Sequence, residues 1–240
     1  MLGAVSAENL RKKLSLLALS LKSFILLAHE VAENYEIMSI QEEITKRNEI
    51  WKSSNTAQRR VLVAKDVIER LNSNQISAEE GNWCSFPEEQ KEGESVQEVI
   101  LKGERCSACG IGSIFLSLIS YVNQLTFTDK DLYGFNMMTD YENETVEYKK
   151  LKNVFSDSQL KLIEQSFEGG RGFFEFDSDV QDYLFYDDYD KPTYRGAAIQ
   201  IAALRFYEKY PSENERLKAI MENIVENGGA FKLHADLRAA

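Results

Sequence analysis

Proline is scarce in this chain, and its scarcity favours long helices over most other arrangements. Three prolines and 13 glycines are spread over 240 residues. Proline breaks helix interiors, so its near absence leaves room for long uninterrupted helices. The apolar fraction is 43%, which is ordinary for a globular protein with a sizeable core. We therefore predict a mainly α fold: a compact multi-helix domain with a minor short β element, plus an N-terminal helical segment.

The spacing of apolar residues divides the chain into two predicted parts. Residues 1–52 form an N-terminal helical segment, and residues 53–240 form the mainly helical body. Between residues 10 and 33 we expect a helix that is apolar on nearly all sides in its middle, and therefore buried inside the fold or against another copy of the chain. A homo-oligomer formed through residues 10–33, acting as a scaffold, is therefore one hypothesis.

The same apolar stretch raises the question of a membrane or a secretion signal. Arg11, Lys12 and Lys13 precede it, as in a signal peptide, but Lys22 interrupts it and no small-residue cleavage site follows. The stretch is also too short to cross a bilayer as a helix. We expect no membrane association.

Local signals predict where the helices and strands of the body lie. A capping residue followed three positions later by Glu or Gln marks several helix starts, and proline suits a first helical turn. Residues 81–86 and 96–101 are expected to form short strands. In the helix after Pro192 we expect Leu204 and Tyr207 on the apolar face. Helices are predicted to begin near Ser39, Thr56, Cys106, Ser156, Pro192 and Ser212.

The three cysteines are Cys84, Cys106 and Cys109. A secreted disulfide scaffold usually has more cysteines and an even number, so a reducing, cytoplasmic setting is expected. Cys106 and Cys109 form a CxxC pair at a predicted helix start, where the helix dipole would lower a thiol pKa and favour redox chemistry. With Cys84 as a third ligand and His29 or His234 as a fourth, the pair could instead form a structural zinc site, although the spacing is not that of a standard finger. The third interpretation is that the cysteines are small buried residues where a helix packs closely. No cofactor is expected on this last interpretation.

An acidic aromatic segment, residues 173–194, is the strongest candidate for binding a partner. Its carboxylates alternate with aromatic rings, which would serve as anchors while the carboxylates meet Arg or Lys on the partner. The alternative is that the rings pack inward and the acids face water. The predicted partner-binding residues are Asp177, Asp179, Asp182, Tyr183, Tyr186, Asp187, Asp188, Tyr189 and Asp190.

Charge and missing motifs narrow the functional classes. The formal net charge is −11, so we expect no direct nucleic-acid binding, because phosphate contacts need clustered Lys and Arg. The chain has no phosphate-loop, dinucleotide-binding or nucleophile-elbow motif. Its two histidines, His29 and His234, lie near opposite ends, which argues against a histidine-based catalytic triad. We predict that the chain is not an enzyme.

Four blocks of sequence resemble small uncharacterised proteins of bacteria and their phages. They are RVLVAKDVI from Arg60, CxxCxxGxxF from Cys106, FSxxQLxLIE from Phe155 and NERLxxIMxNI from Asn214, within residues 57–232. The resemblance implies a phage or mobile-element setting and carries no functional residue with it. Small acidic proteins in that setting often act by binding, so the hypothesis is an anti-CRISPR-like inhibitor of a host defence complex. Its partner would be a protein or ribonucleoprotein with a basic surface.

Overall fold

The computed structural model describes residues 22, 25, 28–29, 38–86, 93, 95–122, 146–169 and 194–233. Contacts divide the chain into two compact units, Met1–Lys46 and Arg47–Ala240. The second unit is mainly helical and contains one small sheet, which confirms the predicted fold class. The predicted division after residue 52 stays a prediction. Within the described ranges, no helix combines the length and the apolar composition that crossing a membrane requires.

The helix at residues 38–53 begins earlier than its sequence signal suggested. Ser39 was expected to cap it, but both Met38 and Ser39 are helical. A capping residue needs an extended backbone, so the prediction for Ser39 is wrong. The helix was predicted to run to about Trp51, with a break at residues 53–55, and it continues to Ser53 before the break.

The next helix, α2 (Thr56–Asn72), begins at the predicted residue. Asn55 has an extended backbone, and its side chain accepts from the backbone N–H of Gln58 at 3.0 Å. The Gln58 side chain accepts from the Asn55 backbone N–H at 2.8 Å, which completes a capping box. This reciprocal pair satisfies two backbone donors and fixes the start of α2.

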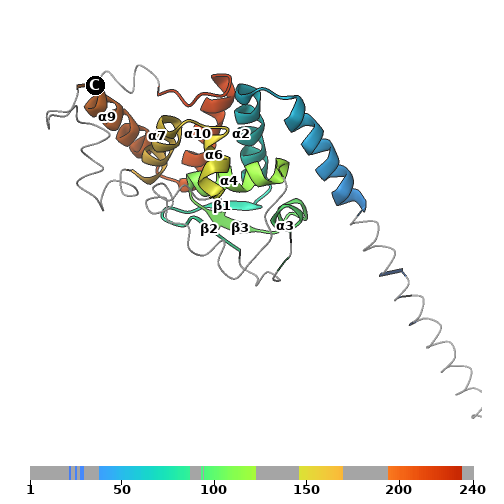
Figure 1. The fold of residues 1–240 in the computed structure, drawn as a ribbon. Coiled ribbons are helices and arrows are strands. Elements are labelled where there is room, and N and C mark those ends of the chain that lie inside the picture. The colour runs from blue at the N-terminus through green and yellow to red at the C-terminus, as the bar shows by residue number, and fades with distance from the viewer. Residues whose placement is uncertain are drawn as a thin grey trace, which may run out of the picture. The chain divides into compact units, whose positions relative to one another are not determined.

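A three-stranded sheet lies on one side of the helices (Figure 1). Its strands are β1 (Ile76–Ala78), β2 (Cys84–Ser85) and β3 (Cys106–Ala108), in the order β1-β3-β2. β3 pairs parallel with β1 and antiparallel with β2. The strand predicted within residues 81–86 is present as β2, whereas β1 had not been predicted.

Residues 96–101, predicted as a strand, are the helix α3 (Val96–Leu101). The Ser95 side chain accepts from the backbone N–H of Glu98 and caps it. Val96, Val99 and Ile100 are buried, and their spacing of three and four residues places them on one helical face. The apolar residues of this short segment therefore follow the helical period rather than alternating as in a strand.

The helix α4 (Gly110–Tyr121) is surrounded on all sides. Each of its residues is buried, and it packs against α2, α3, α7 and the sheet. It was predicted to begin at Cys106 but begins four residues later, because residues 106–108 pair with both neighbouring strands. Cys109 is its N-cap, and its Sγ accepts from the Gly112 N–H at 3.4 Å.

The remaining helices complete the layer above the sheet: α6 (Val146–Lys152), α7 (Asp157–Glu168), α9 (Tyr194–Lys209) and α10 (Glu213–Glu226). α7 and α10 follow Ser156 and Ser212, as predicted, while α6 had not been predicted.

The apolar face of α9 differs from the prediction. Ala202, Ala203 and Phe206 are buried, whereas Leu204 is 37% exposed. The Phe206 ring anchors the face by meeting the ring of Phe231 edge-on, with 5.5 Å between the ring centroids.

The last helix packs along α2 although the two are far apart in sequence. Lys218 on α10 donates to Asn72 Oδ1 at 3.0 Å. Arg60 on α2 donates through Nη1 to the Gly229 carbonyl at 3.3 Å. Two helices far apart in the sequence are thus joined by packing and by hydrogen bonds at their edges.

Candidate functional site

The predicted partner-binding residues lie outside the described part of the chain. They stay predictions: Asp177, Asp179, Asp182, Tyr183, Tyr186, Asp187, Asp188, Tyr189 and Asp190. The structure begins again at Tyr194, in the first turn of α9.

The three cysteines lie on or beside the sheet, and all are free thiols. Cys84 is on β2 and Cys106 on β3, while Cys109 follows β3 as the cap of α4. The CxxC pair was expected to have a lowered thiol pKa at a helix start. Burial instead raises the pKa of Cys106 to about 11 and that of Cys109 to about 12, and it also raises the pKa of Cys84. The expected activation is therefore wrong, because desolvation of the thiolate outweighs the helix dipole.

The zinc interpretation has no described set of ligands. Across the described ranges, no group of three or more His, Cys, Asp or Glu side chains is arranged to hold a metal ion. His29 is exposed in the first unit, and His234 lies beyond the last described residue.

Two acids lie beside Cys109, with Glu168 buried and Glu164 half-buried, and sequence inspection had not singled them out. Burial raises the pKa of Glu164 to about 8 and that of Glu168 to about 7, and each carboxylate further disfavours charge on its neighbours. Glu168 Oε2 accepts from the Gly81 N–H at 3.0 Å. Glu164 Oε2 is buried and has no hydrogen-bond partner among the described residues. Both acids can therefore hold a proton near neutral pH.

Arg216 on α10 connects this acidic cluster to the rest of the unit. It is 1% exposed, and it pairs with Glu80 and donates to the carbonyl of Phe167. It also donates to the carbonyls of Tyr210, at 2.8 Å, and Pro211, at 3.1 Å. A buried charge is tolerated only when it is paired and hydrogen-bonded, and Arg216 meets both conditions.

A second buried ion network joins α2 to its surroundings. Asp66 Oδ2 accepts from Arg70 Nε at 2.7 Å, and Asp66 Oδ1 accepts from Arg47 Nη1 at 2.7 Å. Burial alone would raise the pKa of Asp66, but the two guanidiniums outweigh it and lower that pKa. Arg47 also donates to Ser120 Oγ on α4 at 2.9 Å. These contacts hold helices together, and we assign them no chemistry.

One cavity opens beside α2, α4 and α6. It has a volume of about 290 Å³ and is lined by Trp51, Arg59, Leu118, Val122, Lys150, Asn153 and Val154. The lining combines two cations with an aromatic ring and three aliphatic side chains. None of these seven residues is acidic, in a chain whose net charge is −11.

Sequence signals for these residues exist but are ambiguous. Glu164 and Glu168 are four positions apart within the apolar stripe of α7, and Asp66 and Arg70 have the same spacing in α2. Charged residues at this spacing usually form solvated pairs on a helix surface. Their burial depends on tertiary packing, which the local pattern does not encode.

Comparisons with family models, with curated proteins and with solved structures found no match to this chain.

Proposed function

We propose that this chain is a non-enzymatic protein-binding protein of phage or mobile-element type. Its acidic aromatic segment would contact a basic surface on a partner protein or ribonucleoprotein. Within that class, we propose an inhibitor of a host defence complex of the CRISPR kind.

The observation that carries this proposal is the composition of the segment at residues 173–190. It places six aspartates among seven aromatic residues. Aromatic rings provide contact area at low entropic cost, and carboxylates select Arg and Lys on a partner. A high local density of acid also accelerates encounter with a basic surface.

The described body supports a binding role over thiol chemistry. Nucleophilic cysteines need an accessible thiolate, whereas burial raises the pKa of Cys106 and Cys109 well above the ordinary value of 9.0. Arg216 is fully engaged by backbone carbonyls and Glu80, and thus has a structural use.

The test is an affinity pull-down with a triple charge reversal. Asp187, Asp188 and Asp190→Lys should abolish capture of the partner, identified by mass spectrometry as a protein with a basic face. The matched control reverses three exposed glutamates on α9 and α10: Glu208, Glu222 and Glu226→Lys. Both variants change the net charge equally, so equal losses, or no loss in the aspartate variant, would contradict the proposal.

The proposed inhibition of a host defence complex is tested by a separate assay. Expression of the chain in a CRISPR-immune host should raise the plaquing efficiency of a targeted phage. The Asp187, Asp188 and Asp190→Lys variant should not. If the unaltered chain does not change the plaquing efficiency, the defence-inhibitor role is rejected. The binding role is then tested by the pull-down alone.

A second candidate function is an oligomeric scaffold, because two apolar side chains of the first unit are uncovered. Ile25 is 59% exposed and Met38 is 64% exposed. Exposed large apolar residues favour burial against another copy of the chain. Sedimentation velocity should show an oligomer that Ile25→Lys reduces and Lys22→Gln, a change of charge at another described residue of the first unit, does not. A monomer at all concentrations would reject this function.

A further inference from the structure

We propose that the cavity lined by Trp51, Arg59 and Lys150 binds a small phosphate monoester that carries a planar ring. Nucleoside monophosphates belong to this chemical class. The proposal concerns a different surface from the acidic aromatic segment and does not depend on the function proposed above.

The charge of the cavity is opposite to that of the chain. Arg59 and Lys150 contribute two cations, and no described lining residue is acidic. Arg59 donates through Nε to the Trp51 carbonyl at 3.1 Å, and no described group accepts a hydrogen bond from its terminal nitrogens. Lys150 forms no ion pair with any described group. Both cations are therefore available to an anion.

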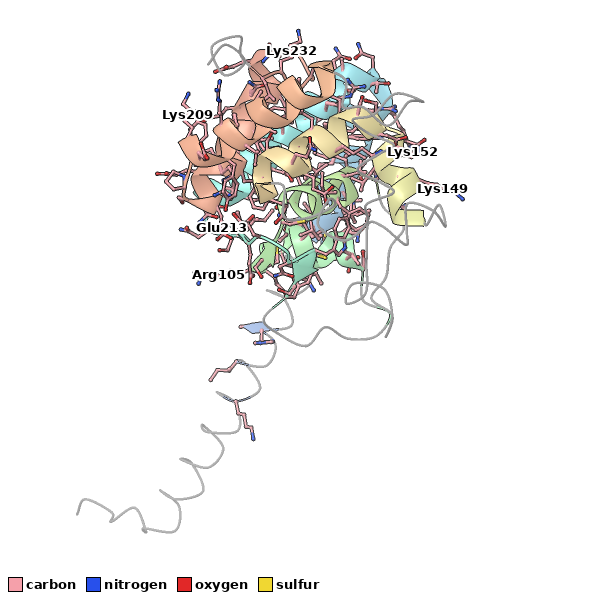
Figure 2. The ribbon with its side chains drawn as sticks, turned by 90° about the vertical axis from the view of Figure 1, so that its left-hand side faces the viewer. Arg105, Lys149, Lys152, Lys209, Glu213 and Lys232 are labelled. Carbon is pink, nitrogen blue, oxygen red and sulfur yellow. The ribbon has the colours of Figure 1, made fainter. Side chains whose placement is uncertain are left out.

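More positive charge lies on the same helix as Lys150. Figure 2 shows Lys149 and Lys152 on α6, at the edge of the unit opposite Arg105. Lys152 pairs with Asp157 at 3.3 Å, so its charge is partly compensated. The basic residues of α6 add a local attractive field for an anion within a chain that is acidic overall.

A chain of stacked groups holds Arg59 in place. Its guanidinium carbon lies 5.1 Å from the centroid of the Trp51 ring. The Trp51 ring stacks on Tyr121 with 5.6 Å between centroids, and the Arg47 guanidinium carbon lies 4.9 Å from the Tyr121 ring centroid. A cation that is already fixed loses little rotational freedom when a ligand arrives.

The lining specifies both halves of the ligand. A phosphate monoester carries a charge of about −1.5 to −2 at pH 7, which matches one guanidinium and one ammonium. A guanidinium can meet two phosphate oxygens at once. Trp51, Leu118 and Val122 offer an apolar wall to a ring, and the Asn153 amide offers a donor and an acceptor to its edge.

The size of the cavity limits the ligand. Its volume of about 290 Å³ lies at the lower end of the range for ligand pockets. This favours a mononucleotide over a dinucleotide or a polymer. The prediction that the chain does not bind nucleic acid directly is therefore compatible with the proposal.

The test is isothermal titration calorimetry of the full chain with four probes: adenosine monophosphate, phenyl phosphate, adenosine and inorganic phosphate. The two ring-bearing phosphates should bind. Adenosine and inorganic phosphate should each bind at least about tenfold more weakly, because each lacks one of the two groups that the cavity recognises.

Three variants locate the binding. Lys150→Gln and Arg59→Gln should each weaken adenosine monophosphate binding by about tenfold or more. Arg105→Gln removes an equal charge from an exposed position at the other edge of the unit, and it should leave binding unchanged. Lys150 forms no contact with a described polar group, so Lys150→Gln should leave the fold intact. It therefore tests the proposal even if Arg59→Gln does not fold.

Four results would overturn the proposal. The proposal fails if neither phosphate monoester binds at millimolar concentration, or if Lys150→Gln binds as well as the unaltered chain. Equal weakening by Arg105→Gln would show a nonspecific charge effect. Adenosine or inorganic phosphate binding as tightly as adenosine monophosphate would remove the two-part recognition. The Asp187, Asp188 and Asp190→Lys variant should retain the binding, which separates this proposal from the proposed function.

Discussion

The guanidinium of Arg216 lies over the ring of Tyr207, with 3.8 Å between its central carbon and the ring centroid. α9 and α10 are thereby joined by a cation–π contact whose cation is buried. The same guanidinium pairs with Glu80 in the turn after β1. One side chain therefore connects two helices and the sheet.

Replacement of Arg216 should destabilise the second unit strongly. Arg216→Leu removes the partner of Glu80 and leaves the carbonyls of Phe167, Tyr210 and Pro211 without their donor. We expect a loss of about 3 kcal/mol or more in the free energy of unfolding, measured by urea denaturation. Arg216→Lys should recover only part, because an ammonium lacks the planar fork.

The control for this change is Arg105→Leu. Arg105 is exposed, so its replacement should alter stability by less than about 0.5 kcal/mol. Similar losses for the two variants would show that the Arg216 network is not specifically stabilising.

Stability should fall as pH rises from about 5 to 8. The pKa values of Glu164 and Glu168 are raised to about 8 and about 7 from an ordinary value of 4.5. The folded chain therefore binds more protons than the unfolded chain in this window, and the free energy of unfolding decreases with pH. The lowered pKa of Asp66 acts only below its ordinary value of 3.8, outside this window.

Urea midpoints at pH 5.5, 6.5, 7.5 and 8.0 measure this dependence. Glu164→Gln keeps the side chain polar and uncharged, so it should flatten the slope and raise stability at pH 8.0 relative to the unaltered chain. A midpoint that rises with pH over this window in both proteins would exclude the buried acids as its source.

The folded chain should protect its thiols from reaction. Thiolate is the reactive form, and the pKa values of Cys106 and Cys109 are raised to about 11 and about 12. A chromogenic disulfide reagent at pH 8 should therefore modify the folded protein slowly, and it should modify three thiols per chain in guanidinium chloride. Rapid modification of Cys109 in the folded protein would contradict this prediction and would support the redox interpretation of the CxxC pair.

Gly112 should tolerate no side chain. A Cβ at this position would lie 1.6 Å from the backbone oxygen of Trp83, which is rigid and cannot move aside cheaply. Gly112→Ala should cost about 3 kcal/mol or more in thermal or urea unfolding, because α4 has to shift away from the chain before β2.

The neighbouring Ser113 offers a matched control on the same helix. Its hydroxyl is buried and finds no hydrogen-bond partner in the described part of the chain, so Ser113→Ala removes an unsatisfied polar group. We expect no loss of stability, or a small gain. A loss as large as that of Gly112→Ala would mean that any change in α4 is destabilising and that the close approach at Gly112 has no special effect.

Several helix starts could be predicted from the sequence, because capping is local chemistry, although the starts expected at Ser39 and Cys106 were wrong. The break before Thr56 could be predicted, and Asn55 there forms a full capping box. Ser212 also occupies a cap position as predicted, although its side chain makes no capping hydrogen bond. The position of a helix start thus follows from the sequence more reliably than the contact that fixes it.

The errors concern segments whose structure depends on distant partners. Residues 106–108 are a strand because β1 and β2 lie on both sides of them, and the local sequence was compatible with a helix. The raised thiol pKa of Cys109 arises from burial and from Glu168, more than fifty positions away. The cavity at Trp51 combines three separate segments, so no local motif could have indicated it.

The pairing of α2 with α10 has a consequence during protein synthesis. Lys218 and Asn72, which join these helices, are 146 positions apart. At a translation rate of about 5–20 residues per second, α10 leaves the ribosome about 7 to 30 s after α2. Throughout that interval α2 lacks the helix that packs along it in the finished protein. A nascent chain that stalls before residue 213 therefore exposes apolar surface that the finished protein buries, and it is a substrate for chaperones or for aggregation.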